Sequence, residues 1–308
     1  MWANQEQITQ LYVGIDGGGS KCRASIYTQE FEVLGTGVAG RANPLHGLEQ
    51  TFESITQSVL LALKDAGLPE STMSDLIAGM GLAGVNVPRL HKKMMDWAHP
   101  FKAIYLTTDL HTACLGAHKS GDGALIITGT GSCGFAQVND ETLCLGGHGF
   151  ALGDKGSGAW IGLKAAEHVL LNLDGFACDT ALTPAILAQC EAKDAVDIVE
   201  KLAGKSSSCY AAMARAVIAC ANEGDEVANN ILQEGAKYIS ELARKLFTIN
   251  PKRFSMVGGL AEPMRKWLDD DVVERISPIL APPEAGAMYF ALQQHNKNLH
   301  IAANITAV

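Results

Sequence analysis

Residues 11–28 read LYVGIDGGGSKCRASIYT. Apolar and β-branched residues fill the first five positions, and after the glycine turn small or apolar residues alternate with polar ones, which is the period of a β-strand. The run EVLGTGVA follows at once at 32–39. This opening segment therefore predicts an antiparallel meander of strands joined by glycine turns.

The period then lengthens to that of a helix. Apolar side chains recur every three or four residues at Leu48, Phe52, Ile55, Val59 and Leu63. This spacing predicts one apolar face of a long amphipathic helix. Further strands are predicted at 76–80 and 104–107, with helices between and after them, so the first half is mixed α/β.

The second half repeats this order. ALIIT at 124–128 leads into a glycine-rich turn, which is followed by CGFAQV at 133–138 and TLCLG at 142–146. Matching DGGGS with GTGS keeps the strand, turn and strand context, which indicates an internal duplication with a boundary near 117–123. After residue 157 the pattern is helical, except for a predicted strand at 254–257 that runs into two glycines.

Composition limits the classes of function. The 308 residues carry 24 Lys and Arg against 33 Asp and Glu, a net charge of -9, which argues against a nucleic-acid partner. No run reaches the roughly 18–20 apolar residues of a membrane helix, and the first ten residues lack the features of a signal peptide. We therefore expect a cytoplasmic protein with no membrane partner. Its eight cysteines include no C-x-x-C pair, so we expect reduced, mostly buried thiols.

The first glycine turn is a candidate phosphate site. In Gly17-Gly18-Gly19-Ser20 the missing Cβ atoms let backbone N–H groups converge on an anion, although a tight hairpin turn without a ligand has the same sequence. Asp16 would repel a phosphate unless Mg²⁺ lay between them, so it favours a metal-nucleotide site. The alternative for Asp16 is a side chain that only stabilises the turn.

Two further glycine segments could complete a nucleotide site. TGTGS at 128–132 offers more backbone donors and hydroxyls for the outer phosphates, and the glycines of VGG at 257–259 would admit an adenine or its ribose. An ordinary strand-to-helix turn explains the second segment equally well.

Three polar residues are candidate substrate ligands. Asp109 follows a predicted strand and precedes a helix, so it suits either a ligand at the carboxyl end of a strand or a helix N-cap. Asp154, between glycines and before another helix, has the same two alternatives. Asn43, before a proline, suits a turn or a polar contact with a substrate.

Together these segments resemble a known family. YVGIDGGGSKCRASIY, LTTDLHTACLGAH, IITGTGSCG, GDKGSGAWIGLKAA and MVGGLAE occur in the order found in N-acetylglucosamine and glucosamine kinases, and the bacterial glucosamine kinases are the most similar. These kinases belong to the BadF/BadG-type ATPase branch of the sugar kinase/actin/Hsp70 superfamily. The resemblance implies an α/β protein of two ribonuclease-H-like lobes with an ATP cleft between them. It implies one lobe of residues 1–117 and 283–308, with the sugar site and first phosphate loop, and a second of 118–282, with the second loop and the adenosine site.

The resemblance also implies a reaction. Asp109 would be the catalytic base that deprotonates the 6-hydroxyl of an amino sugar as it attacks the γ-phosphorus of ATP, and Asp16 would organise Mg²⁺, directly or through water. The implied sugar ligands are Asn43, Asp109 and Asp154. The implied ATP ligands are Gly17, Gly18, Gly19, Ser20, Lys21, Thr130, Gly131, Ser132, Gly258 and Gly259. Since members of the family are often dimers, a homodimer is also expected.

Two departures from the pattern bear on the sugar. Cys133 stands where the animal N-acetylglucosamine kinases have asparagine, and Lys155 replaces the glutamate of their GDEGS. Because both positions are expected near the sugar, we predict glucosamine as the substrate, with N-acetylglucosamine as the alternative. More remote alternatives are an activator ATPase of an acyl-CoA dehydratase, whose cysteine arrangement is missing, and a sugar sensor without catalysis.

Overall fold

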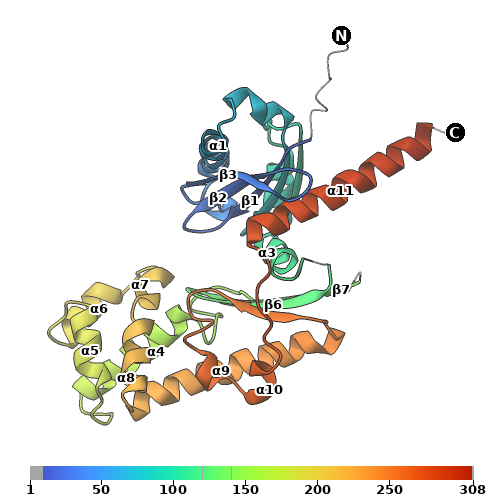
Figure 1. Ribbon diagram of the computed structural model, residues 1–308. Helices are drawn as coiled ribbons and strands as arrows, with labels where there is room; N and C mark the ends of the chain where they lie inside the picture. The colour runs from blue at the N-terminus through green and yellow to red at the C-terminus, as the bar shows by residue number, and fades with distance from the viewer. Residues whose placement is uncertain (1–9, 120, 140, 307–308) are drawn as a thin grey trace. The chain divides into compact units, whose positions relative to one another are not determined.

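The computed structural model describes residues 10–119, 121–139 and 141–306. The chain forms two compact units: unit 1 runs to Gly121 and resumes at Pro278, and unit 2 spans Asp122–Ser277. Each unit is built on one β-sheet with helices packed against it (Figure 1). The boundaries lie a few residues from the predicted positions after residues 117 and 282.

Unit 1 contains a five-stranded sheet in the order β3-β2-β1-β4-β5. The strands β1 to β3 form the predicted antiparallel meander, β4 is parallel to β1, and β5 is parallel to β4. This arrangement is the ribonuclease-H-like order. The strands are Tyr12–Gly17 (β1), Cys22–Tyr27 (β2), Val33–Ala39 (β3), Ile77–Leu82 (β4) and Ala103–Thr108 (β5).

Helices cover this sheet. The long predicted helix is α1, Leu48–Asp65, which contacts β2 and β3 and buries Ile55 and Val59 completely. Both α3 (Asp109–His118) and α11 (Pro283–Thr306) contact β1 and β4, and they also contact each other (Figure 1). The remaining elements of unit 1 are α2, Pro88–Met95, and the short 3₁₀ helices η1, Pro44–His46, and η2, Glu70–Asp75.

Glycines let the backbone of α11 lie directly on the sheet. A methyl group on Gly14 of β1 would overlap the carbonyl oxygen of Glu284, and one on Gly79 of β4 would overlap that of Ala287. Protein interiors are close-packed and do not absorb such an overlap without displacement. The start of α11 is therefore held close to the central strands of unit 1.

Unit 2 contains a four-stranded sheet in the order β8-β7-β6-β9. Its antiparallel pairs β6–β7 and β7–β8 and its parallel pair β6–β9 repeat the arrangement of β1 to β4 in unit 1. This repetition agrees with the predicted duplication. The strands are Gly123–Thr128 (β6), Ser132–Val138 (β7), Glu141–Gly146 (β8) and Phe254–Val257 (β9).

Most of unit 2 is helical. Its largest apolar cluster joins α4, α8 and α9 to β6 and β9, with Ile126, Ile161, Leu232 and Met256 among its members. The helices are Gly158–Leu173 (α4), Leu182–Gln189 (α5), Ala195–Leu202 (α6), Ser207–Ala211 (α7), Ala214–Asn222 (α8), Glu226–Leu246 (α9) and Asp270–Val273 (α10), with 3₁₀ turns at Phe247–Ile249 (η3) and Arg265–Trp267 (η4).

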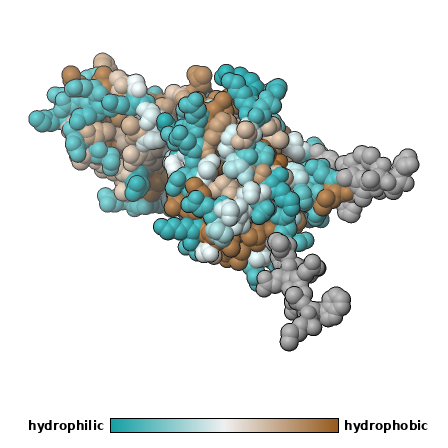
Figure 2. Space-filling model, turned by 90° about the horizontal axis from the view of Figure 1, so that it is seen from above, coloured by the Kyte–Doolittle hydropathy of each residue, from teal (hydrophilic) through white to brown (hydrophobic). Residues whose placement is uncertain are grey.

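The surface is mixed in polarity. Hydrophilic residues are spread over the face seen in Figure 2, with hydrophobic residues between them. Among the described residues, no helix has the length and apolar character needed to cross a bilayer. The expectation of mostly buried cysteines was wrong, since of the eight only Cys22, Cys114 and Cys220 are buried.

Candidate functional site

Asp109 lies where β5 meets α3. The cap of this helix is the preceding residue, Thr108, whose hydroxyl accepts a hydrogen bond from the His111 N–H at 3.3 Å. The N-cap alternative for Asp109 is therefore wrong. Its carboxylate accepts local backbone hydrogen bonds, including one from the Leu110 N–H to Oδ1 at 2.9 Å. Burial raises the pKa of the Asp109 carboxyl above its usual value, although the local backbone bonds act in the opposite direction.

Asp16 lies at the same edge of the sheet of unit 1. In the strand register Asp16 is opposite Gly81 of β4, and Gly81 is opposite Thr107 of β5. The pKa of Asp16 is raised to about 7, chiefly by burial and then by the negative charges of Glu284 and Asp109, while the positive charges of Lys21 and Arg23 act in the opposite direction. The carboxyl ends of the parallel strands thus bring two acidic groups together, where α/β sheets commonly bind ligands.

A third acidic group joins them from the other end of the sequence. Glu284, in the first turn of α11, is 4% exposed and pairs with the Nε atom of Arg23 at 3.1 Å. Arg23 is directly opposite Asp16 in the β1–β2 pair. Sequence reasoning missed Glu284. The acidic residue after two prolines read as an ordinary helix start, and only the packing of α11 on β1 places it here.

These residues fit the magnesium ion that the family resemblance implies. The Asp16 carboxylate accepts no hydrogen bond from the described residues and has acidic neighbours, so a cation would relieve an unfavourable charge. The described residues contain no cluster of three or more His, Cys, Asp or Glu side chains that could enclose a metal. Mg²⁺ is commonly held by one or two carboxylates, water and substrate phosphates, which is the arrangement this region can supply.

The first glycine turn has two structural parts. Gly17 belongs to the packed interior, because a methyl group there would lie 2.5 Å from Leu82 and 2.9 Å from the Ala42 carbonyl. A methyl group on Gly18 would lie 3.9 Å from the Lys21 carbonyl oxygen, and one on Gly19 would meet no atom within 4 Å. The Gly18 N–H closes the turn by donating to the Lys21 carbonyl at 3.0 Å, while the N–H groups of Gly19, Ser20 and Lys21 donate to no described residue. These three donors form a cradle suited to an anion.

The second glycine turn, at 128–132, is hydrogen-bonded to the start of α4. The carbonyl oxygens of Gly129 and Thr130 accept from the N–H groups of Gly158 and Ala159 at the start of α4, at 2.7 and 3.2 Å. The Ser132 hydroxyl is buried and donates to the Lys155 carbonyl at 2.8 Å. This hydroxyl therefore holds the 154–157 turn in place. Among the predicted ATP ligands of this loop, Thr130 and Gly131 have N–H groups that donate to no described residue.

Asp154 lies in contact with this second turn. Its backbone is left-handed, with φ 59°, and Oδ1 accepts from the Gly149 N–H at 3.2 Å. A methyl group on Gly131 would lie 2.8 Å from Oδ2. The cap of α4 is Ser157, so the capping alternative for Asp154 is wrong. Burial raises the pKa of the Asp154 carboxyl, and hydrogen bonds from Gly149 and Ser132 oppose that rise.

Asn43 has a structural role in unit 1. Its Oδ1 atom accepts from the Leu45 N–H at 2.9 Å and caps η1, as the turn alternative predicts. A methyl group on Gly84 would lie 2.5 Å from this oxygen, so the loop after β4 fits closely around it. The Nδ2 group donates to no described residue and is free to bind a substrate.

A cavity of about 610 Å³ lies within unit 2. Its walls combine the second glycine turn, the glycine pair after β9 and a helical wall that sequence reasoning missed. The glycines differ in role: Gly258, with φ 104°, has no room for a side chain beside Thr128, whereas a methyl group on Gly259 would meet no atom within 4 Å. The lining residues are Gly129, Thr130, Gly158, Ser208, Ala211, Ala212, Ala214, Arg215, Gly259 and Leu260.

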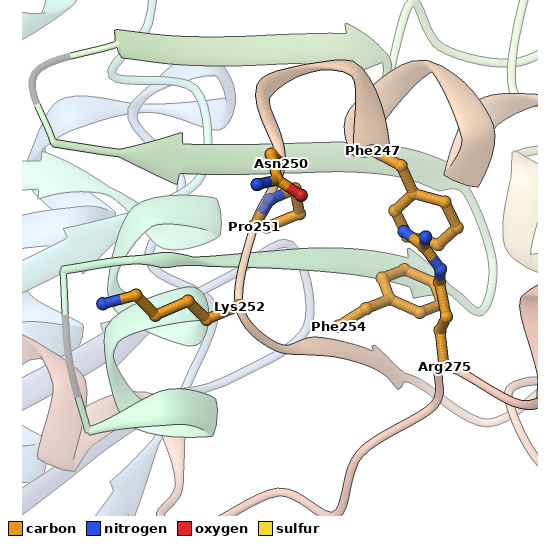
Figure 3. Close-up of a pocket in the computed structure, with 6 residues that line it drawn as sticks. All are labelled: Phe247, Asn250, Pro251, Lys252, Phe254 and Arg275. Carbon is orange, nitrogen blue, oxygen red and sulfur yellow. The ribbon is translucent and has the colours of Figure 1, made fainter.

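A second cavity of unit 2, of about 400 Å³, lies at the opposite end of β9 (Figure 3). The Arg275 guanidinium stacks on the Phe247 ring at 4.5 Å, and the Phe247 and Phe254 rings meet edge to face. The Lys252 side chain points away from these rings (Figure 3). The cavity contains no predicted site residue and lies at the amino end of the parallel strand, so we do not assign it to the site.

Comparison with known proteins agrees with this geometry. The model of the BadF/BadG/BcrA/BcrD ATPase family matches residues 13–291. The chain belongs to this family. A glucosamine kinase of Vibrio cholerae is 33% identical over 92% of this chain and 97% of its own. An N-acetylmuramic acid/N-acetylglucosamine kinase of Clostridium acetobutylicum is 26% identical over 73% of this chain and 75% of its own.

The fold of this BadF-type chain also has a solved counterpart. The structure of a Chromobacterium violaceum protein, provisionally named as an N-acetylglucosamine kinase, superposes with a TM-score of 0.86. The two are 27% identical, and the match covers 92% of this chain and 99% of the other. The predicted fold class, two ribonuclease-H-like units of the sugar kinase type, is confirmed.

Proposed function

We propose that this protein is an ATP-dependent kinase that transfers the γ-phosphate of ATP to the 6-hydroxyl of glucosamine. The main support is Asp109, a half-buried carboxylate that follows β5. Its neighbour Thr108 caps the helix, so the Asp109 carboxylate is not needed as the cap. The family is one of ATPases, and the relative from Vibrio cholerae is a glucosamine kinase.

Asp109 would act as the general base. Its carboxylate takes the proton of the sugar 6-hydroxyl, the sugar oxygen forms a bond to the γ-phosphorus, and the bond from that phosphorus to the bridging oxygen breaks to release ADP. A raised pKa makes the ionised carboxylate a stronger base, because it holds the proton that it receives more tightly. Such catalysis contributes typically about 10²- to 10⁴-fold to the rate.

Backbone groups would bind the nucleotide. The N–H groups of Gly19, Ser20 and Lys21 in unit 1, and those of Thr130 and Gly131 in unit 2, are unused donors for phosphate oxygens. The cavity beside Gly259 has room for the base and ribose. Asp16 would hold Mg²⁺ through water, and the ion would supply charge neutralisation on the phosphates.

An assay coupled to ADP release tests the proposal. Purified protein with ATP and Mg²⁺ should release ADP on adding glucosamine, and less efficiently on adding N-acetylglucosamine, N-acetylmannosamine or glucose. N-acetylglucosamine is the second candidate, since it appears in the name of the Clostridium relative. No turnover with any of these sugars would reject the proposal, and a preference for N-acetylglucosamine would replace the substrate.

Two predictions about the setting of the enzyme accompany this function. Size-exclusion chromatography with light scattering should give the mass of a homodimer, twice the 32.6 kDa of the chain. Cell fractionation should recover the activity from the cytoplasm, where ATP is available.

A further inference from the structure

A cluster of polar side chains surrounds Asp154 in unit 2. A methyl group on Gly146 would lie 3.4 Å from the Tyr238 hydroxyl oxygen, and one on Gly147 would lie 3.1 Å from Cβ of Cys133. The Gly147 N–H donates to the Ser132 carbonyl at 3.0 Å, which joins this turn to the loop that contacts Asp154. We refer to Asp154, Cys133 and Tyr238 as the Asp154 cluster.

The Tyr238 hydroxyl serves no purpose in the fold. Tyr238 comes from the middle of α9 and is half-buried, yet its hydroxyl makes no hydrogen bond within the described residues. Burial raises the pKa of this phenol, and so does the nearby charge of Asp154. By contrast, the Tyr210 hydroxyl in the same unit donates to the Leu202 carbonyl at 2.9 Å.

The cluster is rich in hydrogen-bond acceptors. Lys155, whose charge lowers the pKa of the Tyr238 phenol, pairs with Glu234 of α9 at 2.8 Å. Besides this ion pair, the cluster offers the Asp154 carboxylate and the Tyr238 hydroxyl oxygen as acceptors. Such a set favours a donor group with a positive charge over a carbonyl oxygen, because the carbonyl would find few donors there.

We infer that the Tyr238 hydroxyl, together with the Asp154 carboxylate, binds the ammonium group of the amino sugar. Tyr238 is then a specificity-determining residue that separates glucosamine from sugars without a positive charge. This inference rests on the proposed function and assigns to it a residue that neither the motifs nor the family resemblance indicates.

The test is Tyr238→Phe, with Tyr210→Phe as the matched control. Since the Tyr238 hydroxyl has no internal partner, its removal costs the fold no hydrogen bond. A hydrogen bond to a charged group accounts for about tenfold or more in affinity. We expect KM for glucosamine to rise about tenfold in Tyr238→Phe, while kcat, KM for ATP and KM for glucose change less than about twofold. Calorimetric titration with glucosamine in the absence of ATP should show the same loss of affinity, and Tyr210→Phe should leave these constants unchanged.

The outcomes separate the two claims. A wild-type protein that phosphorylates no amino sugar refutes the proposed function itself. A wild-type glucosamine kinase whose Tyr238→Phe variant keeps its KM for glucosamine refutes only the inference. An equal rise in KM for glucosamine and glucose also refutes it, because the contact would then be to a hydroxyl that both sugars share. Circular dichroism and the melting temperature establish that each variant is folded.

Discussion

Thr108 and Asp109 divide two tasks between adjacent residues. The hydroxyl of Thr108 caps α3, so the carboxylate of Asp109 does not have to. An Asp at a helix start usually stabilises the helix through its own cap, which contributes about 1 kcal/mol. Here a neighbour supplies that stability, and the Asp109 carboxylate accepts local backbone hydrogen bonds, including one from the Leu110 N–H.

The first prediction concerns this base. Asp109→Asn should lower kcat by about 10²- to 10⁴-fold, because an amide cannot accept the proton of the sugar hydroxyl. Calorimetry should show ATP bound as tightly as by the wild type. The exposed Asp96, paired with Lys92 on α2, offers a control, and Asp96→Asn should be fully active. Full activity of Asp109→Asn would contradict the assigned role.

The second prediction concerns Asp16 and pH. Its pKa is raised from 3.8 to about 7, so between these pH values the unfolded chain releases a proton that the folded chain retains. Wild-type stability should therefore fall as pH rises through this window. The Asp16→Asn variant has no carboxyl group at this position, so its stability should not fall for this reason. Without Mg²⁺ at pH 8, the free energy of unfolding of the variant should exceed that of the wild type by on the order of 2 kcal/mol, and its melting temperature should be higher. The difference should be smaller at pH 5.

Differential scanning fluorimetry measures both melting temperatures. If the difference between the two melting temperatures stays constant across pH, the pKa of the Asp16 carboxyl is not raised in the folded protein. Addition of Mg²⁺ should raise the melting temperature of the wild type more than that of Asp16→Asn.

At the scale of elements, the glycines decide how close two backbones come. Gly79 lets α11 rest on β4, and this contact brings Glu284 to Arg23 beside Asp16. The third prediction is that Gly79→Ala lowers stability by about 1–3 kcal/mol, because the methyl group overlaps the Ala287 carbonyl. Gly121→Ala, where the added methyl meets no atom within 4 Å, is the control. Urea denaturation of both variants measures the difference, and equal stabilities would show that α11 can shift at no cost.

The glycine pair after β9 shows two other uses of the residue. Gly258 has φ 104°, and a side chain there would overlap the backbone of Thr128. Gly259 lines the cavity, and a methyl group there would meet no atom within 4 Å. The fourth prediction is that Gly259→Val folds normally but raises KM for ATP about tenfold, with KM for glucosamine unchanged, since the side chain would fill the space proposed for the nucleotide. Gly258→Ala should instead lower the melting temperature. Unaltered ATP kinetics in Gly259→Val would place the nucleotide elsewhere.

At the scale of the whole molecule, each unit has its own glycine turn whose backbone N–H groups are proposed to bind phosphate. The fifth prediction is that ADP with Mg²⁺ slows amide exchange at 19–21 in unit 1 and at 130–131 in unit 2. These amides have no acceptor in the described structure, so they should exchange fast without nucleotide. Millisecond hydrogen exchange with mass spectrometry resolves both segments, and the amides of α2 are the internal reference. Protection of one turn alone would contradict the proposed phosphate-binding role of the other.

The sequence alone determined the local structure and the chemistry of the strand ends. Alternating side chains located the strands, the spacing from Leu48 to Leu63 located α1, and the position after β5 marked Asp109. These features depend on residues close together in the chain, where the spacing of apolar side chains indicates a strand or a helix. The tertiary structure decided which groups meet: Glu284 reaches Arg23 because α11 packs on β1, and Tyr238 of α9 reaches the turn after β8 that adjoins Asp154. It also decided that Thr108 caps α3. Such contacts form because segments far apart in the chain pack against one another, and a local sequence pattern does not predict them.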